Sequence, residues 1–427
     1  MKRLLTLAMI LIVILSNSSI AIEQPPAPDA GAYVLIDSET GGVLCDKNPD
    51  TLVYPASTTK IMTAILALEN GDMNQVMTAS QSAINDIGPD GSNIGIIAGE
   101  QIKLENLLQA LLICSANETA NIIADNIADS RQAFIDMMNR KAKELGATNT
   151  HFANTNGMHD PNHYTTASDM AKFARYAMTF PEFRKIVSSP DLKMPSTNKH
   201  PEWPVLANTN KLMITDKSDL YNINGIKTGF TGQAGYNLVS SATDKKGLTL
   251  IAVVMGVKND GAQENVRTYS KELLDYGFNN FKRVNLLEKG KVYRNIKVDN
   301  AADIYGLDLV TTGSLSCIVP KDAARQNIKE IPHISSKVSA PVNKDDIMGY
   351  VEFIKDDASI GKVDLIAARN IEPKPEPVTL VSKVKGFLNN FFARIGLYVA
   401  GFLIFFLLLR MILRRISRRV HSRRRYS

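Results

Sequence analysis

The sequence predicts an α+β protein in which one antiparallel sheet carries a cluster of helices, followed by a small all-β domain and a C-terminal membrane helix. Three features predict this class. Strand-like runs stand at both ends of residues 28–280, with helix-like segments between them. Residues 283–371 contain only short β-like pieces, and residues 378–413 end in a long apolar run. A length of 427 residues is also enough for two or three domains.

The elements of residues 28–280 begin with a hairpin. Tyr33–Asp37 is an apolar run that leads through a glycine turn into Val43 and Leu44. A helix is expected to open at Ser57 and to end at Asn70-Gly71, because apolar residues recur between them at helical spacing. The other expected elements are helices over Leu104–Ile113, Thr119–Ile127 and about 267–278, and strands over Leu238–Ser241 and Leu248–Val257.

Residues 283–371 differ in character from the preceding domain. Gly, Asp and Asn interrupt short β-rich runs such as Val351–Ile354, and this pattern predicts a small all-β domain with no residues of evident chemical function. Residues 372–377 then alternate proline with charged residues, which is typical of a stiff, extended linker.

The first 21 residues have the pattern of a secretory signal peptide. Lys2 and Arg3 precede the apolar stretch Leu4–Leu15, and Ser19-Ile20-Ala21 is a small-x-small cleavage site. An uncleaved N-terminal anchor is the alternative, but the apolar stretch is short for a membrane span. The sequence therefore predicts an exported protein.

Residues 378–413 are expected to anchor the protein in a membrane. Their first part has the apolar spacing of an amphipathic, surface-lying helix, and residues 395–413 are apolar on every face apart from Arg410. That second part would extend about 28 Å as a helix, which is enough to cross a hydrocarbon core. The alternative is a helix that lies wholly in the interface. We expect the Arg-rich residues 414–427 in the cytoplasm and the body of the protein on the extracytoplasmic side.

Composition excludes several classes of function. The net charge of +6 comes from the two ends, because eight Arg lie in residues 410–427 and Lys2 and Arg3 begin the chain, which leaves −4 for the rest. The body of the chain has no basic stripe interleaved with aromatic residues, so the sequence does not predict nucleic-acid binding. The three cysteines are too few and too widely spaced for a disulfide scaffold, and Cys114 is interpreted as a packed residue rather than a second nucleophile. We expect no cofactor and no metal.

Ser57 and Lys60 form the first chemical motif. Residues three apart on a helix share one face, so the lysine can take the serine proton if its amine is neutral. Burial beside a second cation would lower the lysine pKa, and Lys227 is a candidate for that cation. Ser-x-x-Lys alone is a weak signal, since Ser196 and Ser382 begin further copies.

Two more motifs follow in order along the chain. Ser115-Ala116-Asn117 supplies a hydroxyl to relay a proton and an amide to hold a substrate backbone, although Ser115 with Glu118 also has the spacing of a helix capping box. Lys227-Thr228-Gly229 supplies a cation and a hydroxyl for a substrate carboxylate, and a glycine that lets a peptide approach a strand edge. Its alternative is a plain turn between strands. Only the Ser57 motif heads an apolar-faced helix and has both other motifs downstream.

Together these motifs resemble those of the D-alanyl-D-alanine carboxypeptidases, the low-molecular-mass penicillin-binding proteins of serine peptidase family S11. The resemblance covers residues 28–371 and implies the penicillin-binding-protein/β-lactamase-like transpeptidase fold. Its signature blocks are Tyr54–Lys60, Leu111–Ala120, Asn156–Thr166, Gly225–Gly229 and Leu273–Phe278.

The resemblance implies a mechanism and its partners. Ser57 would attack the penultimate D-Ala of a peptidoglycan stem pentapeptide with Lys60 as general base, and Ser115 would relay the proton to the departing D-Ala. β-Lactams would acylate Ser57. The protein would act in cell-wall maturation as a membrane-bound hydrolase.

Further residues are assigned by the same resemblance. Asn117, Lys227, Thr228 and Gly229 would bind substrate, and the backbone N–H groups of Ser57 and Phe230 would form the oxyanion hole. Arg267 is the candidate for the arginine that binds the substrate carboxylate, although it lies one residue out of register. His159 and His163 are expected to have structural roles.

Other functions remain open at this level. A DD-endopeptidase or a β-lactamase would use the same motifs, although the appended β domain and anchor argue against a lactamase. A catalytically silent scaffold is the alternative outside the enzymes, and the intact set Ser57, Lys60, Ser115, Asn117 and Lys227 argues against it.

Overall fold

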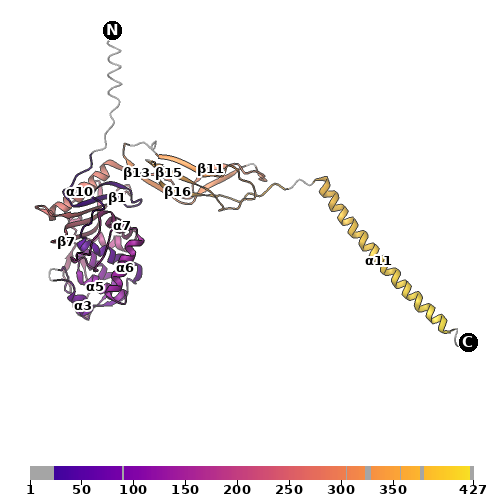
Figure 1. Ribbon diagram of the computed structural model, residues 1–427, viewed down its shortest axis with the longest axis horizontal. Helices are drawn as coiled ribbons and strands as arrows, with labels where there is room; N and C mark the ends of the chain where they lie inside the picture. Colours follow the sequence, from indigo (N-terminus) through magenta and orange to yellow (C-terminus); the bar gives the residue numbers. More distant parts are fainter. Residues whose placement is uncertain are drawn as a thin grey trace, which may run out of the picture. The chain divides into compact units, whose positions relative to one another are not determined.

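The computed structural model describes residues 24–88, 91–303, 305–322, 328–355, 357–375 and 379–423. The predicted signal peptide (1–21), residues 376–377 of the predicted linker and residues 424–427 of the tail lie outside these ranges. The chain divides into two compact units (Figure 1). One holds the chain through Lys289 with Gly313–Ile331 and Glu352–Val363, and the other holds Gly290–Thr312, Pro332–Val351 and the chain from Asp364 onward.

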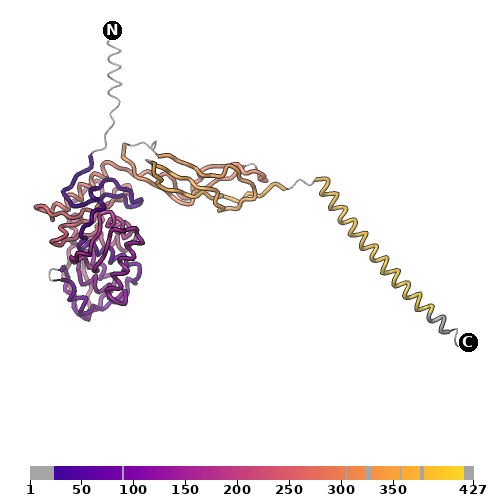
Figure 2. Tube along the Cα trace, in the orientation of Figure 1, coloured from indigo at the N-terminus to yellow at the C-terminus, as the bar shows by residue number. Residues whose placement is uncertain are grey.

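A five-stranded antiparallel sheet organises the first unit. Its strand order is β2-β1-β9-β8-β7, and Figure 1 labels β1 and β7. The strands are β1 (Ala32–Asp37), β2 (Val43–Lys47), β7 (Tyr221–Thr231), β8 (Gly235–Asp244) and β9 (Thr249–Val257). In Figure 2 the indigo start of the described chain runs into this sheet, where β1 pairs with β9 over its whole length. The predicted hairpin and the predicted antiparallel sheet are confirmed.

Both faces of the sheet are covered. All six residues of β1 are buried, and they alternate between two hydrophobic cores because successive strand side chains point to opposite faces. Ala32, Val34 and Ile36 pack into the core of the helical cluster, whereas Tyr33 and Leu35 pack with the long helix α10 (Ala262–Asn280). The unit therefore has three layers, with the sheet in the middle.

The helix α2 (Lys60–Asn70) lies at the centre of the helical cluster. Its residues from Lys60 to Ala67 are all buried, and it contacts α4, α5, α6 and α7. The other elements of the cluster are the 3₁₀ turn η1 (Ala56–Thr59), α3 (Gln81–Asn85), α4 (Leu104–Ile113), α5 (Asn117–Ile127), α6 (Arg131–Glu144), α7 (Ala167–Ala177), α8 (Pro181–Val187) and α9 (Leu212–Thr215). Two small ribbons accompany them, β3 (Val76–Thr78) with β4 (Gln101–Lys103) and β5 (Asp191–Lys193) with β6 (Val205–Ala207).

Several expected elements agree with the structure. The helix α4 has the predicted bounds, and α5 and α10 extend the predicted helices. The helix expected to open at Ser57 starts as η1 and becomes α-helical only at Lys60, because Ala56 has a left-handed φ of 48° and the chain enters through a tight turn. The helices α6, α7 and α8 were not expected.

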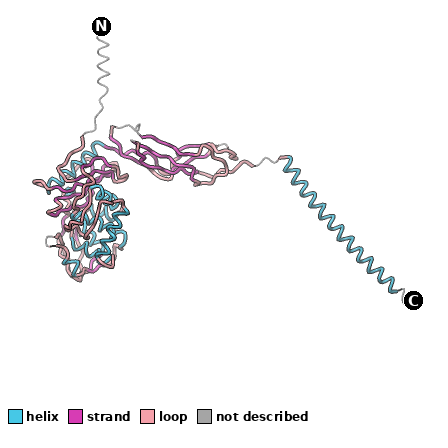
Figure 3. The backbone as a smooth tube through the Cα atoms, viewed as in Figure 1, coloured by secondary structure: helices cyan, strands magenta, loops and turns pink. Residues whose placement is uncertain are grey.

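The described residues from Phe281 to Ala367 form an all-β region. Here β10 (Phe281–Leu287) pairs with β13 (Leu315–Pro320), and a five-stranded sheet has the order β11-β12-β16-β15-β14. Its strands are β11 (Val292–Ile296), β12 (Leu307–Thr311), β14 (Ile328–Ile334), β15 (Ile347–Lys355) and β16 (Ala358–Ala367). Figure 3 shows strands without helices along this stretch, which confirms the predicted fold class.

The chain ends in the 44-residue helix α11 (Leu380–Arg423). It is the one helix among the described residues that is long and apolar enough to cross a membrane, with Leu380–Ser417 as the candidate span. The amphipathic and apolar parts that the sequence predicts thus form one continuous helix.

The buried face of α2 yields a test of stability. Ile65 is fully buried in the main core, so Ile65→Ala should lower the free energy of unfolding by about 2–5 kcal/mol, and Ile65→Val by about 1 kcal/mol. Val205→Ala is the control, because Val205 is 64% exposed and its truncation should change little. Thermal unfolding of the full chain in detergent would report these differences. Equal melting temperatures for Ile65→Ala and Val205→Ala would contradict the assignment of α2 as the central helix.

Candidate active site

Ser57 lies in the turn η1, immediately before the central helix. Its Oγ is 2.9 Å from the Nζ of Lys60, so the predicted pair is in direct hydrogen-bond contact. The Thr58 hydroxyl donates to the Pro55 carbonyl at 2.7 Å and closes the turn. Ser57 is half-buried while Lys60 is fully buried, so the serine faces outward with the lysine behind it.

Lys60 has three hydrogen-bond partners. Besides Ser57, its Nζ donates to Asn117 Oδ1 at 2.6 Å and to the Asn156 carbonyl at 2.7 Å. A neutral amine has two N–H bonds and one lone pair. The two carbonyl oxygens accept hydrogen bonds from those two N–H groups. The lone pair is then left to accept the proton of Ser57 Oγ. This geometry suits a lysine that acts as a base.

The charges around Lys60 favour its neutral form. Burial lowers the pKa of Lys60 well below its usual range, the nearby charge of Lys227 lowers it further, and Glu118 opposes the shift. Burial also lowers the pKa of Lys227, to about 7. Burial lowers the pKa of both lysines, but the charge of a second cation lowers the pKa further only for Lys60. We therefore take Lys60 as the neutral amine and Lys227 as the cation.

Ser115 and Asn117 lie where α4 passes into α5. Ser115 has a left-handed φ of 62° and is 5% exposed. The residue that caps α5 is Ala116, without a side-chain cap, so the capping-box alternative for Ser115 is wrong. The sharp turn places Asn117 at the first position of α5, from which its side chain reaches Lys60.

Lys227, Thr228 and Gly229 lie on β7, the last strand in the order of the main sheet. Lys227 is 1% exposed, and Thr228 Oγ1 donates to Thr209 Oγ1 at 2.8 Å. A Cβ at Gly229 would lie 2.9 Å from the Pro55 carbonyl oxygen and 3.2 Å from the Ser57 nitrogen. The strand therefore packs directly on residues 55–59, the candidate catalytic turn, and only glycine allows that distance.

Several supporting residues were not singled out from the sequence. Asn237 Nδ2 donates to the carbonyls of Tyr54 and Pro55 at 2.9 and 3.0 Å, and so ties β8 to the catalytic turn. Gly157 has a φ of 92°, and a Cβ there would lie 1.9 Å from the Ala56 oxygen. The sequence block Asn156–Thr166 was recognised from its resemblance. Its hydrogen bond to Lys60, through the Asn156 carbonyl, joins residues 96 positions apart and was not predicted.

The structural role expected for the histidines holds for His163. Its Nε2 lies 2.7 Å from Thr59 Oγ1, and its Nδ1 accepts the Ala153 N–H at 3.0 Å. Burial lowers the pKa of His163 to about 3, so this ring is neutral and braces the catalytic turn. The ring of His159 packs edge-on against Tyr54.

Two family models match this chain. The model of D-alanyl-D-alanine carboxypeptidase, peptidase family S11, matches residues 19–259, more than half of the chain. The chain belongs to this family. The model of the penicillin-binding protein 5 C-terminal domain matches residues 281–373.

Relatives of this S11 protein align with it along almost its full length. It is 29% identical over 402 residues to D-alanyl-D-alanine carboxypeptidase DacF of Bacillus subtilis, covering 92% of this chain and 100% of the relative. It is 33% identical to DacA of Haemophilus influenzae, covering 83% and 89%. The structure of penicillin-binding protein 5 from Haemophilus influenzae superposes with a TM-score of 0.69 at 31% identity, covering 82% and 99%.

Phe230 and Arg267 complete the predicted site residues of this S11 protein. Phe230 follows Gly229 on β7. Its ring is exposed, and the ring centroids of Phe230 and Tyr236 lie 4.3 Å apart. Arg267 lies on α10, where its guanidinium pairs with Asp216 at 3.0 Å and with Glu264. These carboxylates already neutralise Arg267, so its role in binding substrate stays a prediction.

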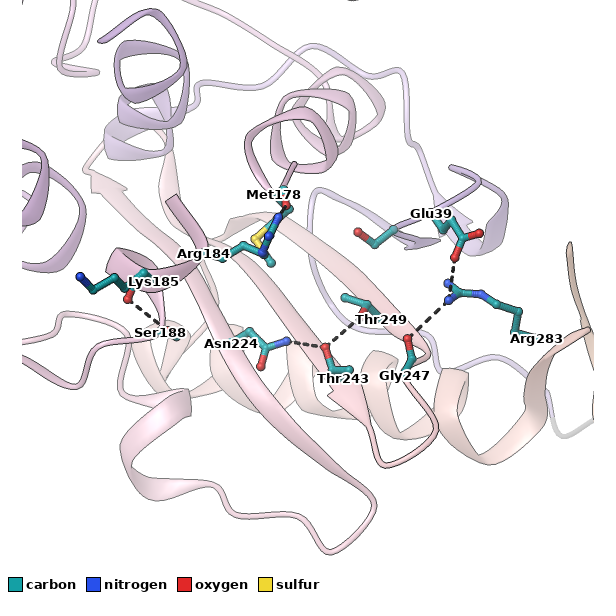
Figure 4. A pocket seen from close by; sticks show the side chains of 11 residues that line it. Glu39, Met178, Arg184, Lys185, Ser188, Asn224, Thr243, Gly247, Thr249 and Arg283 are labelled. Carbon is teal, nitrogen blue, oxygen red and sulfur yellow. Dashed lines mark hydrogen bonds and ion pairs between the residues drawn. The ribbon is translucent and has the colours of Figure 1, made fainter. Parts of the chain in front are cut away.

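A cavity of about 540 Å³ lies elsewhere in the same unit (Figure 4). Several of its polar groups contact one another: Asn224 donates a hydrogen bond to Thr243, the Thr243 and Thr249 hydroxyls share a hydrogen bond, and Arg283 forms an ion pair with Glu39. None of its lining residues belongs to the predicted site.

The described residues contain no cluster of three or more His, Cys, Asp or Glu suited to a metal ion. Burial raises the pKa of the Cys114 thiol to about 11, which agrees with its interpretation as a packed residue.

Proposed function

We propose that this chain is a membrane-anchored DD-carboxypeptidase with Ser57 as its nucleophile and Lys60 as its general base. The observation that carries the proposal is the fully buried amine of Lys60, 2.9 Å from Ser57 Oγ and bonded to Asn117 and Asn156. The names of the chain's relatives indicate a substrate that ends in D-Ala-D-Ala, and we infer that this substrate is a peptidoglycan stem peptide.

The first half-reaction forms an acyl-enzyme. Lys60 takes the proton of Ser57 as Oγ bonds to the carbonyl carbon of the penultimate D-Ala. The oxyanion is held by the backbone N–H groups of Ser57 and Phe230. The peptide bond breaks as the proton passes from Lys60 through the Ser115 hydroxyl to the amine of the leaving D-Ala.

The second half-reaction restores the enzyme. Water attacks the ester on Ser57, Lys60 accepts the water proton and returns a proton to Ser57 Oγ, and the shortened peptide leaves with a new carboxylate. A β-lactam enters the first step in the same way, and its ring opens to give an ester on Ser57.

Substrate binding is assigned to the residues beside this pair. Lys227 and Thr228 take the terminal carboxylate, with Arg267 as a further candidate, and the Asn117 amide holds the peptide backbone. Gly229 leaves room for the peptide along the edge of β7.

The proposed organisation follows the predicted boundaries. Residues 28–280 form the catalytic domain and residues 283–371 a β domain, supported by family matches over 19–259 and 281–373. Residues 1–21 act as an export signal, 372–377 as a linker, 378–413 as the anchor and 414–427 as a cytoplasmic tail. The long apolar helix α11 supports the anchor.

D-Alanine release from a stem pentapeptide tests the central assignment. The full chain in detergent should release D-Ala and form a covalent adduct with a labelled penicillin, and Ser57→Ala should abolish both. Ser196→Ala is the matched control, because Ser196 begins another Ser-x-x-Lys sequence, and it should keep full activity. Absence of release and of the adduct from the unchanged chain would favour the scaffold alternative.

The pH dependence tests the separate states of the two lysines. Lys60 must be neutral and Lys227 charged, so kcat/KM should fall on the alkaline side as Lys227 loses its proton near pH 7. Arginine keeps its charge to much higher pH, so Lys227→Arg should move the alkaline limb to higher pH by about 2 pH units or more. It should also lower the maximum of kcat/KM. An alkaline limb that stays in place in Lys227→Arg would assign it to another group.

The anchor can be tested in cells. A chain that ends after residue 377 lacks α11 and should appear in the soluble exported fraction, whereas the full chain should stay with the membrane through an alkaline wash. A tag on the C-terminus should resist protease added outside and a tag after residue 28 should not. Release of the full chain by the wash would instead favour a helix that lies in the interface.

A further inference from the structure

A buried carboxylate next to the catalytic groups has no part in the reaction above. Glu118 follows Asn117 in α5 and is 1% exposed. Its Oε1 accepts the backbone N–H of Ile94 at 2.7 Å, and its buried Oε2 has no hydrogen-bond partner among the described residues. A buried charge of this kind is costly unless its surroundings stabilise it.

The segment Gly91–Ile97 supplies that stabilisation. Besides Ile94, the backbone N–H groups of Gly95 and Ile96 favour the charged carboxylate, although burial raises the pKa of Glu118 overall. Gly95 has a left-handed φ of 90°, which turns the chain directly after Ile94, the residue whose N–H binds the carboxylate. Glu118 therefore holds the middle of this segment.

The same segment is attached to Asn117. The carbonyl of Ser92 accepts the Asn117 backbone N–H at 2.7 Å, and the backbone of Gly91 packs on the side-chain amide, because a Cβ at Gly91 would lie 2.6 Å from Asn117 Nδ2. The other end of that amide, Oδ1, accepts from Lys60 at 2.6 Å. Any shift of the segment would thus rotate the amide that orients Lys60.

Glu118 also acts on the site through its charge. The titratable groups that its charge affects are Lys60 at the start of α2 and Cys114 after α4. The negative charge of Glu118 raises the pKa of Lys60 and of the Cys114 thiol, whereas Lys227 lowers both.

We propose that Glu118 is a positioning residue for acylation: its carboxylate fixes Gly91–Ile97 against Asn117 and places a negative charge behind Lys60. It acts through Asn117 and Lys60 rather than on the substrate. The inference rests on the proposed function, because it concerns the same base.

Two substitutions separate the two effects. Glu118→Gln keeps an oxygen for the Ile94 N–H but removes the charge, and Glu118→Ala removes both. Glu202→Gln is the control, because Glu202 is exposed. The measurements are the rate of acylation by a labelled penicillin, kcat/KM for D-Ala release from a pentapeptide, and the pH profile of each, on the full chain in detergent.

We expect Glu118→Ala to acylate about 10–100-fold more slowly, as for a displaced catalytic group. Glu118→Gln should lose less than about tenfold, and its acidic limb should move to lower pH by about 0.5 unit, because loss of the negative charge lowers the pKa of Lys60. A residue that only stabilises the fold would lower the melting temperature and leave that limb in place.

Rates within twofold of the unchanged chain in both variants, with an unmoved acidic limb, would overturn the proposal. If Glu118→Ala does not fold, Glu118→Gln decides alone, and an unmoved limb overturns it. Failure of the proposed function is distinct, because the unchanged chain itself would then show neither acylation nor D-Ala release.

Discussion

The three hydrogen bonds of the Lys60 amine are the constraint on which the rest of the site depends. Burial makes a protonated Lys60 unfavourable, and the charge of Lys227 outweighs the opposing charge of Glu118, so the fold itself drives the amine toward its neutral form. The carbonyl oxygens of Asn117 and Asn156 then fix the direction of its lone pair. In the proposed mechanism Ser57 needs no histidine, because the amine of Lys60 lies 2.9 Å from its hydroxyl.

The three layers of the fold bring the motifs together. The central helix α2 fixes Lys60, the sharp turn between α4 and α5 presents Ser115 and Asn117, and β7 carries Lys227. Close backbone packing at Gly157 and Gly229, together with the Asn237 amide, locks the catalytic turn against strand and loop. The proposed nucleophile, Ser57, can therefore face outward while its proposed base, Lys60, stays buried.

Much of this architecture was predictable from sequence because its signals are local. The bounds of α4, the strands of the hairpin and the spacing of Ser57 to Lys60 follow from apolar periodicity and helix geometry. The helices α6 to α8 were not predicted. The helix-capping alternative for Ser115 was wrong, because Ser115 lies in a left-handed turn that a short motif does not reveal, and Ala116 occupies the cap position. The Asn156 carbonyl and the Glu118 contacts join residues far apart in sequence, so only tertiary structure reveals them.

The state of the Lys60 amine at working pH tests the account most directly. Lysine residues labelled with ¹³C at Cε report their protonation by NMR, and Lys60→Arg identifies the signal of Lys60 in the full chain in detergent. The account predicts that the Lys60 signal is that of a neutral amine at pH 7, while exposed lysines remain charged. A Lys60 signal that stays charged to pH 10 would contradict a lysine base and require another proton acceptor for Ser57.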